Sequence, residues 1–198
     1  GKSDFVAGQL SQTDRNGRLA GAIAPLANWG SDVKNRLTRP AMEAVAGIDR
    51  RADLPKFHGK TFAMRAKAAP PPRDAEAPAK ARKVAIFATC YCDSVLPQAV
   101  EDLAAVLTHN DIPAKLVAKE VCCGMPKLEL GDLASVTKYK NENIPVLAQA
   151  VRDGFDLTAA IPSCVLMFKQ ELPLMFPDDE DVKLVQRAFF DPFEYLAE

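Results

Sequence analysis

The sequence predicts an α/β fold: a small parallel sheet with crossover helices, preceded by a helical, loosely packed N-terminal arm. Three short apolar runs of strand length, residues 84–88, 114–118 and 157–161, are separated by segments with helical spacing of apolar residues. The first and third runs show no alternation of apolar and polar residues, which is typical of strands buried on both faces of a parallel sheet. Hydrophobic residues make up 48% of the 198 residues, enough for a packed core.

The composition and the capping residues of the first 65 residues predict short helices. Residues 10–28 are rich in Ala and Gly and contain a break at Pro25. A Ser-Asp pair can cap a short helix over residues 31–37. A helical stretch at residues 41–46 begins after Pro40 and is followed by a glycine. Proline is common at the start of a helix and glycine just after its end.

Residues 66–81 are a Pro/Ala-rich run with interspersed charges, which predicts an extended linker. We therefore expect three parts: an N-terminal arm (1–65), this linker, and an α/β domain (82–198). Residues 1–80 carry a net charge of +6 and residues 81–198 one of −7. This uneven charge has two possible explanations. The two parts have surfaces of opposite sign, or the basic arm docks on a membrane or an acidic partner. The basic residues show no nucleic-acid-binding motif.

The helices of the domain follow from spacing and caps. Apolar residues at helical spacing form one buried face after the first strand: Leu96, Val100, Leu103 and Leu107. Residues 131–154 predict two helices separated at Pro145. Further helices are expected after Cys164 up to residue 172, over residues 178–189, and from residue 191 to the end.

All five cysteines directly follow the three apolar runs: Cys90 and Cys92, Cys122 and Cys123, and Cys164. Because the carboxyl ends of parallel strands meet at one edge of a sheet, these thiols are expected to converge. No secretory signal and no membrane-spanning run is present, so a reducing, cytoplasmic location and a metal or redox role are expected. The chain also lacks an initiator Met, which suggests a fragment of a longer protein.

The adjacent pair Cys122 and Cys123 favours a polynuclear cluster over zinc. Side chains of neighbouring residues diverge on a strand, so both thiols can serve one centre only where the backbone is irregular. Gly124 and Pro126 supply turn chemistry at that point. Cys-x-x-Cys knuckles of the kind typical of zinc sites are absent from the sequence.

Residues 82–198 resemble the CCG (cysteine-rich) domain found in the B subunit of heterodisulfide reductase, and the first such domain in the iron–sulfur C subunit of anaerobic glycerol-3-phosphate dehydrogenase. The resemblance rests on Cys90 in Phe-Ala-Thr-Cys-Tyr, on Cys122-Cys123-Gly124 in Lys-Glu-Val-Cys-Cys-Gly-Met-Pro, and on Cys164 in Ser-Cys-Val-Leu-Met. Upstream segments, including Arg39-Pro40-Ala41-Met42, are similar to the segment that joins a ferredoxin module to this domain in the C subunits. In the family pattern a further cysteine stands where this sequence has Met167.

The resemblance implies an iron–sulfur cluster, of 4Fe-4S type and either cubane or non-cubane. Because of Met167, three outcomes are open: Cys90, Cys122, Cys123 and Cys164 hold the cluster alone, Cys92 serves as a fifth ligand, or the domain holds no cluster. The expected function is an electron-transfer component of a multi-subunit oxidoreductase rather than a self-contained enzyme. It would pass electrons between a flavoprotein dehydrogenase subunit and a quinone or other acceptor, alongside a ferredoxin-like or second CCG domain and peripheral to the inner face of the cell membrane. The alternative is a non-catalytic interaction module that has lost its cluster.

Overall fold

The computed structural model describes residues 6–9, 11–60, 64–65, 82–117 and 121–197, and the linker expected at 66–81 lies outside them. The described residues form a small parallel sheet whose strands follow one another in the order β2-β1-β3-β4. The strands are β1 (Val84–Ile86), β2 (Ala114–Leu116), β3 (Asp156–Thr158) and β4 (Phe189–Phe190). This confirms the predicted α/β class.

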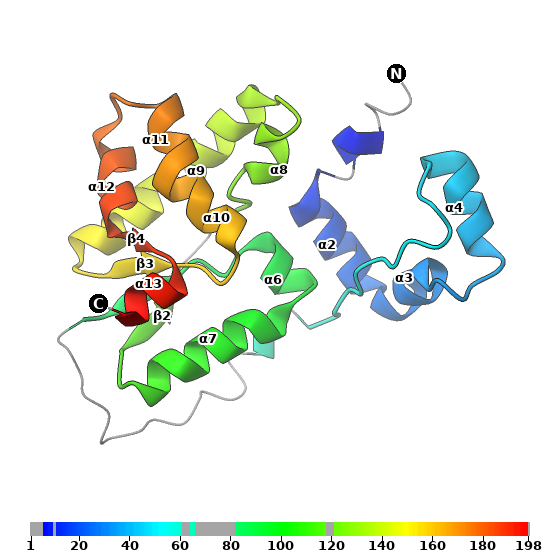
Figure 1. The fold of residues 1–198 in the computed structure, drawn as a ribbon, viewed down its shortest axis with the longest axis horizontal. Coiled ribbons are helices and arrows are strands. Elements are labelled where there is room, and N and C mark those ends of the chain that lie inside the picture. Colours follow the sequence, from blue (N-terminus) through cyan, green and yellow to red (C-terminus); the bar gives the residue numbers. More distant parts are fainter. Residues whose placement is uncertain (1–5, 10, 61–63, 66–81, 118–120, 198) are drawn as a thin grey trace.

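Helices cover both faces of the sheet (Figure 1). Ala85 and Phe87 point into a core shared with α9, α10 and α12, whereas Val84 and Ile86 point into a core shared with α7 and α13. The bounds are α7 (Pro97–His109), α9 (Leu133–Arg152), α10 (Pro162–Leu166), the π-helix η1 (Met167–Glu171), α11 (Leu172–Met175), α12 (Glu180–Ala188) and α13 (Pro192–Ala197). Burial of β1 on both faces is what the continuous apolar run at 84–88 indicates.

Two sequence expectations for this domain were wrong. Helix α9 continues through Pro145 as one helix of 20 residues, because Pro145 lies on its exposed side while Ile144, Leu147 and Ala148 keep its buried face intact. Phe189 was expected to end a helix but begins β4 (Phe189–Phe190), where it is fully buried and stacks on Phe168 with ring centroids 4.9 Å apart. Tertiary packing outweighs local propensity at both positions.

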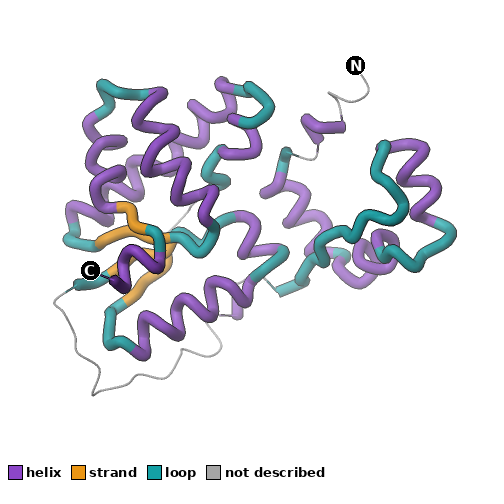
Figure 2. The backbone as a smooth tube through the Cα atoms, in the orientation of Figure 1, coloured by secondary structure: helices purple, strands orange, loops and turns teal. Residues whose placement is uncertain are grey.

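The N-terminal arm contains α2 (Thr13–Ala22), α3 (Ala24–Ser31) and α4 (Thr38–Ala46). The break between α2 and α3 falls at Ile23, two residues before Pro25. The short helix expected at 31–37 is replaced by turns, because Asp32 and Asn35 side chains accept backbone N–H groups two and three residues later. Figure 2 shows the arm lying to one side of the sheet, with α2 nearest the domain.

Helix α2 of the arm packs against the short helix α6 (Cys90–Ser94) of the domain. Gly17 allows this approach, because a Cβ there would lie 2.8 Å from Ser94 Cβ. The loop after α4 adds a backbone hydrogen bond from His58 N to Ser94 O at 2.9 Å. None of the helices in the described ranges is long and apolar enough to cross a membrane.

Candidate metal centre

The three cysteine stretches meet at the carboxyl edge of the sheet. Cys90 begins α6 after β1, Cys122 and Cys123 precede α8 (Met125–Leu128), and Cys164 lies in α10 after β3. Cys90 Sγ lies 3.7 Å from Cys122 Sγ and donates a hydrogen bond to it. All five cysteines are free thiols, so the pair is close without a disulfide.

Cys122 is the central sulfur of this group. Hydrogen bonds from Cys123 and from Cys90 lower the pKa of Cys122, so it is the thiol most readily ionised. The same contacts raise the pKa of the donors: a hydrogen bond to Cys122 is the main cause for Cys90, and hydrogen bonds with Cys122 and Cys164 are the main causes for Cys123. The sulfur atoms therefore form one interacting series from Cys90 through Cys122 and Cys123 to Cys164.

Cys92 lies apart from this series. It is fully buried in the core that α7 shares with β1, whereas Cys123 and Cys164 belong to the core on the opposite face. Its backbone N–H is held by Thr89 Oγ1, 3.1 Å away, which caps α6. Of the five cysteines singled out in the sequence, the structure thus brings four together and places Cys92 elsewhere.

The backbone at the Cys-Cys-Gly segment is irregular, as the adjacent thiols require. Gly124 has a φ of 102°, a conformation that residues with a Cβ rarely adopt. Asn143 of α9, which is only 2% exposed, holds the preceding residues: its Oδ1 accepts Val121 N at 3.0 Å and its Nδ2 donates to Cys122 O at 3.0 Å. Without these bonds, buried backbone groups of the segment would have no partner.

Helix α2 covers the exposed side of the sulfur group. Thr13 Oγ1 lies 3.2 Å from Cys90 Sγ and 3.5 Å from Cys122 Sγ. Asp14 Oδ2 accepts the backbone N–H of Cys122 at 2.9 Å, and burial raises the pKa of this carboxyl group. The sequence interpretation assigned no role to Thr13, Asp14 or Asn143, because each is more than 20 residues from the cysteines that it contacts.

The comparison with known proteins points to a family. The family model "Cysteine-rich domain" (CCG) matches residues 84–169, the segment that contains β1, β3 and all the cysteines. Residues 84–169 are therefore similar to a CCG domain.

Two kinds of curated relative support the assignment of the CCG domain. The chain is 29% identical over 167 residues to the C subunit of anaerobic glycerol-3-phosphate dehydrogenase from Escherichia coli K12, and the same holds for the protein of strain O157:H7. These alignments cover 83% of this chain and 40% of the relative, so the chain spans well under half of the relatives' length. Lactate utilization protein A of an Exiguobacterium strain is 28% identical over 96 residues, covering 48% of this chain and 38% of the relative. No solved structure matches the chain.

The four thiols of the series are the residues that could hold a metal or a cluster. Among the described residues, no group of three or more His, Cys, Asp or Glu side chains is arranged to hold one metal ion. The four thiols instead form an extended series, in which neighbouring sulfurs can bind different metal ions of one cluster. Thiolate sulfur is a soft donor and suits iron in such clusters.

Met167, which stands where the resemblance implies a further cysteine, lies in the core beside this site. It is fully buried, and its Cε lies 3.4 Å from the point where a Cβ on Gly124 would stand. The residue also begins the π-helix η1, an element that is frequent at functional sites. An apolar thioether therefore packs against the Cys-Cys-Gly turn.

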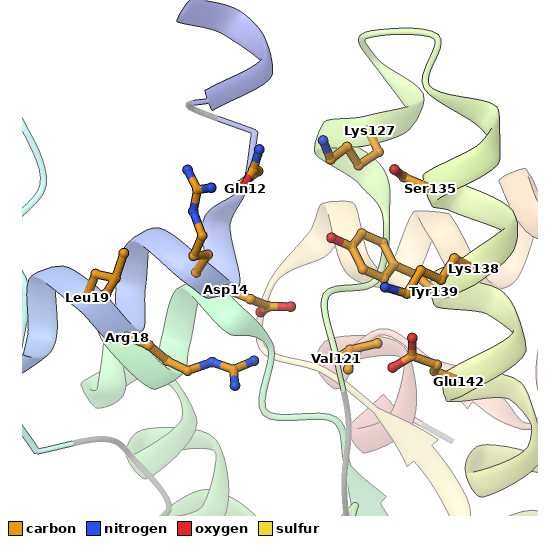
Figure 3. A pocket seen from close by; sticks show the side chains of 11 residues that line it. Gln12, Asp14, Arg18, Leu19, Val121, Lys127, Ser135, Lys138, Tyr139 and Glu142 are labelled. Atoms are coloured by element: carbon orange, nitrogen blue, oxygen red, sulfur yellow. The ribbon is translucent and has the colours of Figure 1, made fainter.

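Two pockets flank the cover formed by α2. One, of about 640 Å³, lies between α2 and the helices α8 and α9 and is lined mainly by polar and charged side chains (Figure 3). The other, of about 800 Å³, lies between the helices of the arm and α6, and its lining is mainly apolar but includes Cys90 and Thr13. The apolar pocket thus reaches Cys90, whereas the polar pocket borders the cysteine segment at Val121 without including a cysteine.

Proposed function

We propose that the chain is an iron–sulfur electron-transfer component of a multi-subunit oxidoreductase. The observation that carries the proposal is the series of four thiols at the carboxyl edge of a CCG domain, with Cys122 at its centre. Relationship to the C subunit of a dehydrogenase supports it.

In this proposal Cys90, Cys122, Cys123 and Cys164 hold a cluster of the 4Fe-4S type. When bound, such a cluster accepts and passes on single electrons. The chain's own residues set its surroundings. Thr13 can donate a hydrogen bond to the sulfur of Cys90 or Cys122, Asn143 fixes the backbone of Cys122, and α2 limits access of water. Hydrogen bonds to sulfur and solvent exposure are both factors that tune the reduction potential of these centres.

The proposed partners are argued from the relatives. The C subunit of glycerol-3-phosphate dehydrogenase is by its name part of a complex, so we propose a flavoprotein dehydrogenase subunit as electron donor and a quinone or another acceptor beyond this chain. A ferredoxin-like or second CCG domain would complete the electron path, since the relatives extend well beyond the matched region. A peripheral position on the inner face of the cell membrane fits the basic arm.

Metal and sulfide analysis of protein purified without oxygen tests the cluster. We expect about four iron and four acid-labile sulfide per chain, with the absorption and spin signals of a cluster. Protein that contains neither iron nor sulfide under these conditions contradicts the proposal.

Single cysteine replacements test the ligand set. Cys122→Ser should lose most of its iron, because the central thiolate is removed. Cys92→Ser is the matched control and should keep its iron, since Cys92 lies in the other core. Equal loss in both variants would instead make Cys92 a fifth ligand, and full retention in Cys122→Ser would refute the ligand set.

A second candidate function is a non-catalytic interaction module. The observation that favours it is the apolar surface of the arm, where Leu19, Leu26 and Leu37 are 62%, 61% and 78% exposed. Under this alternative, Cys122→Ser leaves both complex assembly and turnover unchanged. Loss of turnover with intact assembly supports the electron-transfer role.

A further inference from the structure

The pocket between α2, α8 and α9 has an excess of positive charge. Four cationic side chains and two carboxylates line it: Arg15, Arg18, Lys127 and Lys138, with Asp14 and Glu142. Its volume of about 640 Å³ lies within the usual range for small-molecule sites. The lining therefore favours a small, negatively charged occupant.

Most of the positive charge is not neutralised within the protein. In the part of the chain that the structure describes, the Arg18 and Lys138 side chains form no hydrogen bond or salt bridge, although the charge of Arg18 attracts the Asp14 carboxylate. Arg15 donates to the neutral amide oxygen of Gln9 at 2.5 Å, which leaves its charge uncompensated. Lys127 is the exception, because its Nζ lies 3.3 Å from Asp132 Oδ2.

The carboxylates offset the cations only in part. One oxygen of Asp14 is already used, because it accepts the backbone N–H of Cys122 at 2.9 Å. Glu142 is exposed on α9. An anion that enters the pocket would therefore meet a net positive field.

The cations stand on opposite walls. Arg15 and Arg18 come from α2 of the arm, whereas Lys127 and Lys138 come from α8 and α9 of the CCG domain. Figure 3 shows Arg18 on one side and the two lysines on the other. An anionic group between the walls can contact both at once. Guanidinium groups suit this because their planar donors match the oxygens of a carboxylate or a phosphate.

Tyr139 forms part of the wall beside the Cys-Cys-Gly turn. Its hydroxyl points across the pocket toward α2 (Figure 3), and burial raises its pKa, so it remains a hydrogen-bond donor. Its ring packs against the Cys-Cys-Gly turn, since Tyr139 Cδ2 lies 3.8 Å from the position of a Cβ on Gly124. A molecule bound here would lie beside the Cys122 segment.

We propose that this pocket binds a small organic anion, with its carboxylate or phosphate group between Arg15 and Arg18 on one wall and Lys127 and Lys138 on the other. The Tyr139 hydroxyl donates a further hydrogen bond to the ligand. The site goes beyond electron transfer and requires no cluster, because its lining contains no cysteine.

Titration calorimetry of the full chain tests the site, with succinate as the carboxylate probe and inorganic phosphate as the phosphate probe. Each titration is run at constant ionic strength set with chloride. Saturable binding of either probe supports the proposal, and the preferred probe identifies the chemical class. Lack of saturable binding of both probes overturns it. Iron content is measured separately, so failure here is distinguishable from failure of the proposed electron-transfer role.

Charge-changing variants make the test specific to the pocket. Arg18→Gln and Lys138→Gln should each weaken binding by about ten-fold, the typical effect of losing a charged hydrogen bond. Glu142→Gln should strengthen binding, because it removes a carboxylate from the lining. A general loss of folding cannot produce shifts in opposite directions.

Matched controls lie elsewhere on the arm. Arg36→Gln and Lys34→Gln make the same charge changes at exposed positions outside the lining and should leave the affinity unchanged. Weakening by the controls equal to that by Arg18→Gln would show attraction to overall charge and would overturn the pocket assignment. Circular dichroism confirms that each variant is folded.

Discussion

Asn143 is the residue on which the backbone of the Cys-Cys-Gly segment depends. It is 2% exposed and bonds Val121 N, Cys122 O and, at 3.3 Å, Val121 O. Asn143→Ala would leave buried backbone groups unpaired, so we expect the free energy of unfolding to fall by about 2–4 kcal/mol. Urea unfolding measures the change.

Asn110→Ala is the control for that prediction. Asn110 Nδ2 donates to Val106 O at 2.8 Å but at an exposed site, where water replaces the lost bond. We expect a cost below about 0.5 kcal/mol. An equal fall in the free energy of unfolding in the two variants would show that the hydrogen bonds of Asn143 do not stabilise the Cys-Cys-Gly segment more than an exposed hydrogen bond does.

The sequence alone predicts the cysteines of the site but not the residues around them. Cys90, Cys122 and Cys164 could be placed together because each follows a strand, and parallel strands end at one edge. Asn143 and Thr13 could not be placed there, since their contacts with Cys122 span 21 and 109 residues and depend on how α9 and α2 pack. Cys92 was singled out by the same spacing, and the structure places it in the core that β1 shares with α7, a position that the spacing does not reveal.

At the level of elements, the contact of α2 with α6 determines how closely the arm covers the thiols. A Cβ on Gly17 would lie 2.8 Å from Ser94 Cβ and closer still to its Oγ. Gly17→Ala should therefore push α2 away from α6 and loosen the contacts of Thr13 with Cys90 and Cys122. We expect faster reaction of these thiols with Ellman's reagent in reduced, cluster-free protein.

Two further variants check the cause. Gly30→Ala introduces the same methyl group in α3 with nothing within 4 Å and should leave thiol reactivity unchanged. Combining Gly17→Ala with Ser94→Gly removes the obstructing side chain and should restore slow reaction. If the double variant reacts as fast as Gly17→Ala alone, the cover is not controlled by this contact.

Elements that depend on strong local signals form where the sequence predicts them, whereas elements that depend on tertiary packing do not. Helix α4 ends at Gly47, which has a φ of 71°, as its sequence position predicts. Pro145 was expected to end a helix, yet α9 continues because its buried face is continuous on both sides of the proline. Strand β4 has only two residues and pairs with β3, a long-range contact that helical spacing over 178–189 cannot reveal.

At the scale of the whole molecule, the basic N-terminal part contacts the acidic domain, and one of these contacts reaches the cysteine segment. Arg65 Nε lies 2.6 Å from Glu101 Oε1, and Asp14 reaches Cys122 N. In the proposed division into arm, linker and domain, helix α2, which covers the thiols, belongs to the arm, whereas the thiols themselves belong to the domain. An anion held between them would strengthen that junction.

Stability of the whole molecule should fall in acid, in part through Asp179. This carboxylate caps α12 and lies 2.5 Å from Lys140 Nζ of α9, and the hydrogen bond from Lys140 lowers its pKa. Because its folded pKa lies below the unfolded value of about 3.9, its stabilisation is present above about pH 4 and is lost as pH falls through the folded pKa. Asp179→Asn keeps a side chain that caps well but loses the charge. It should lower the free energy of unfolding by less than about 1 kcal/mol at pH 6 and by progressively less as the pH falls through the folded pKa, as measured by urea unfolding over a pH series. A difference that does not shrink as the pH falls would assign the effect to the cap rather than to the ion pair.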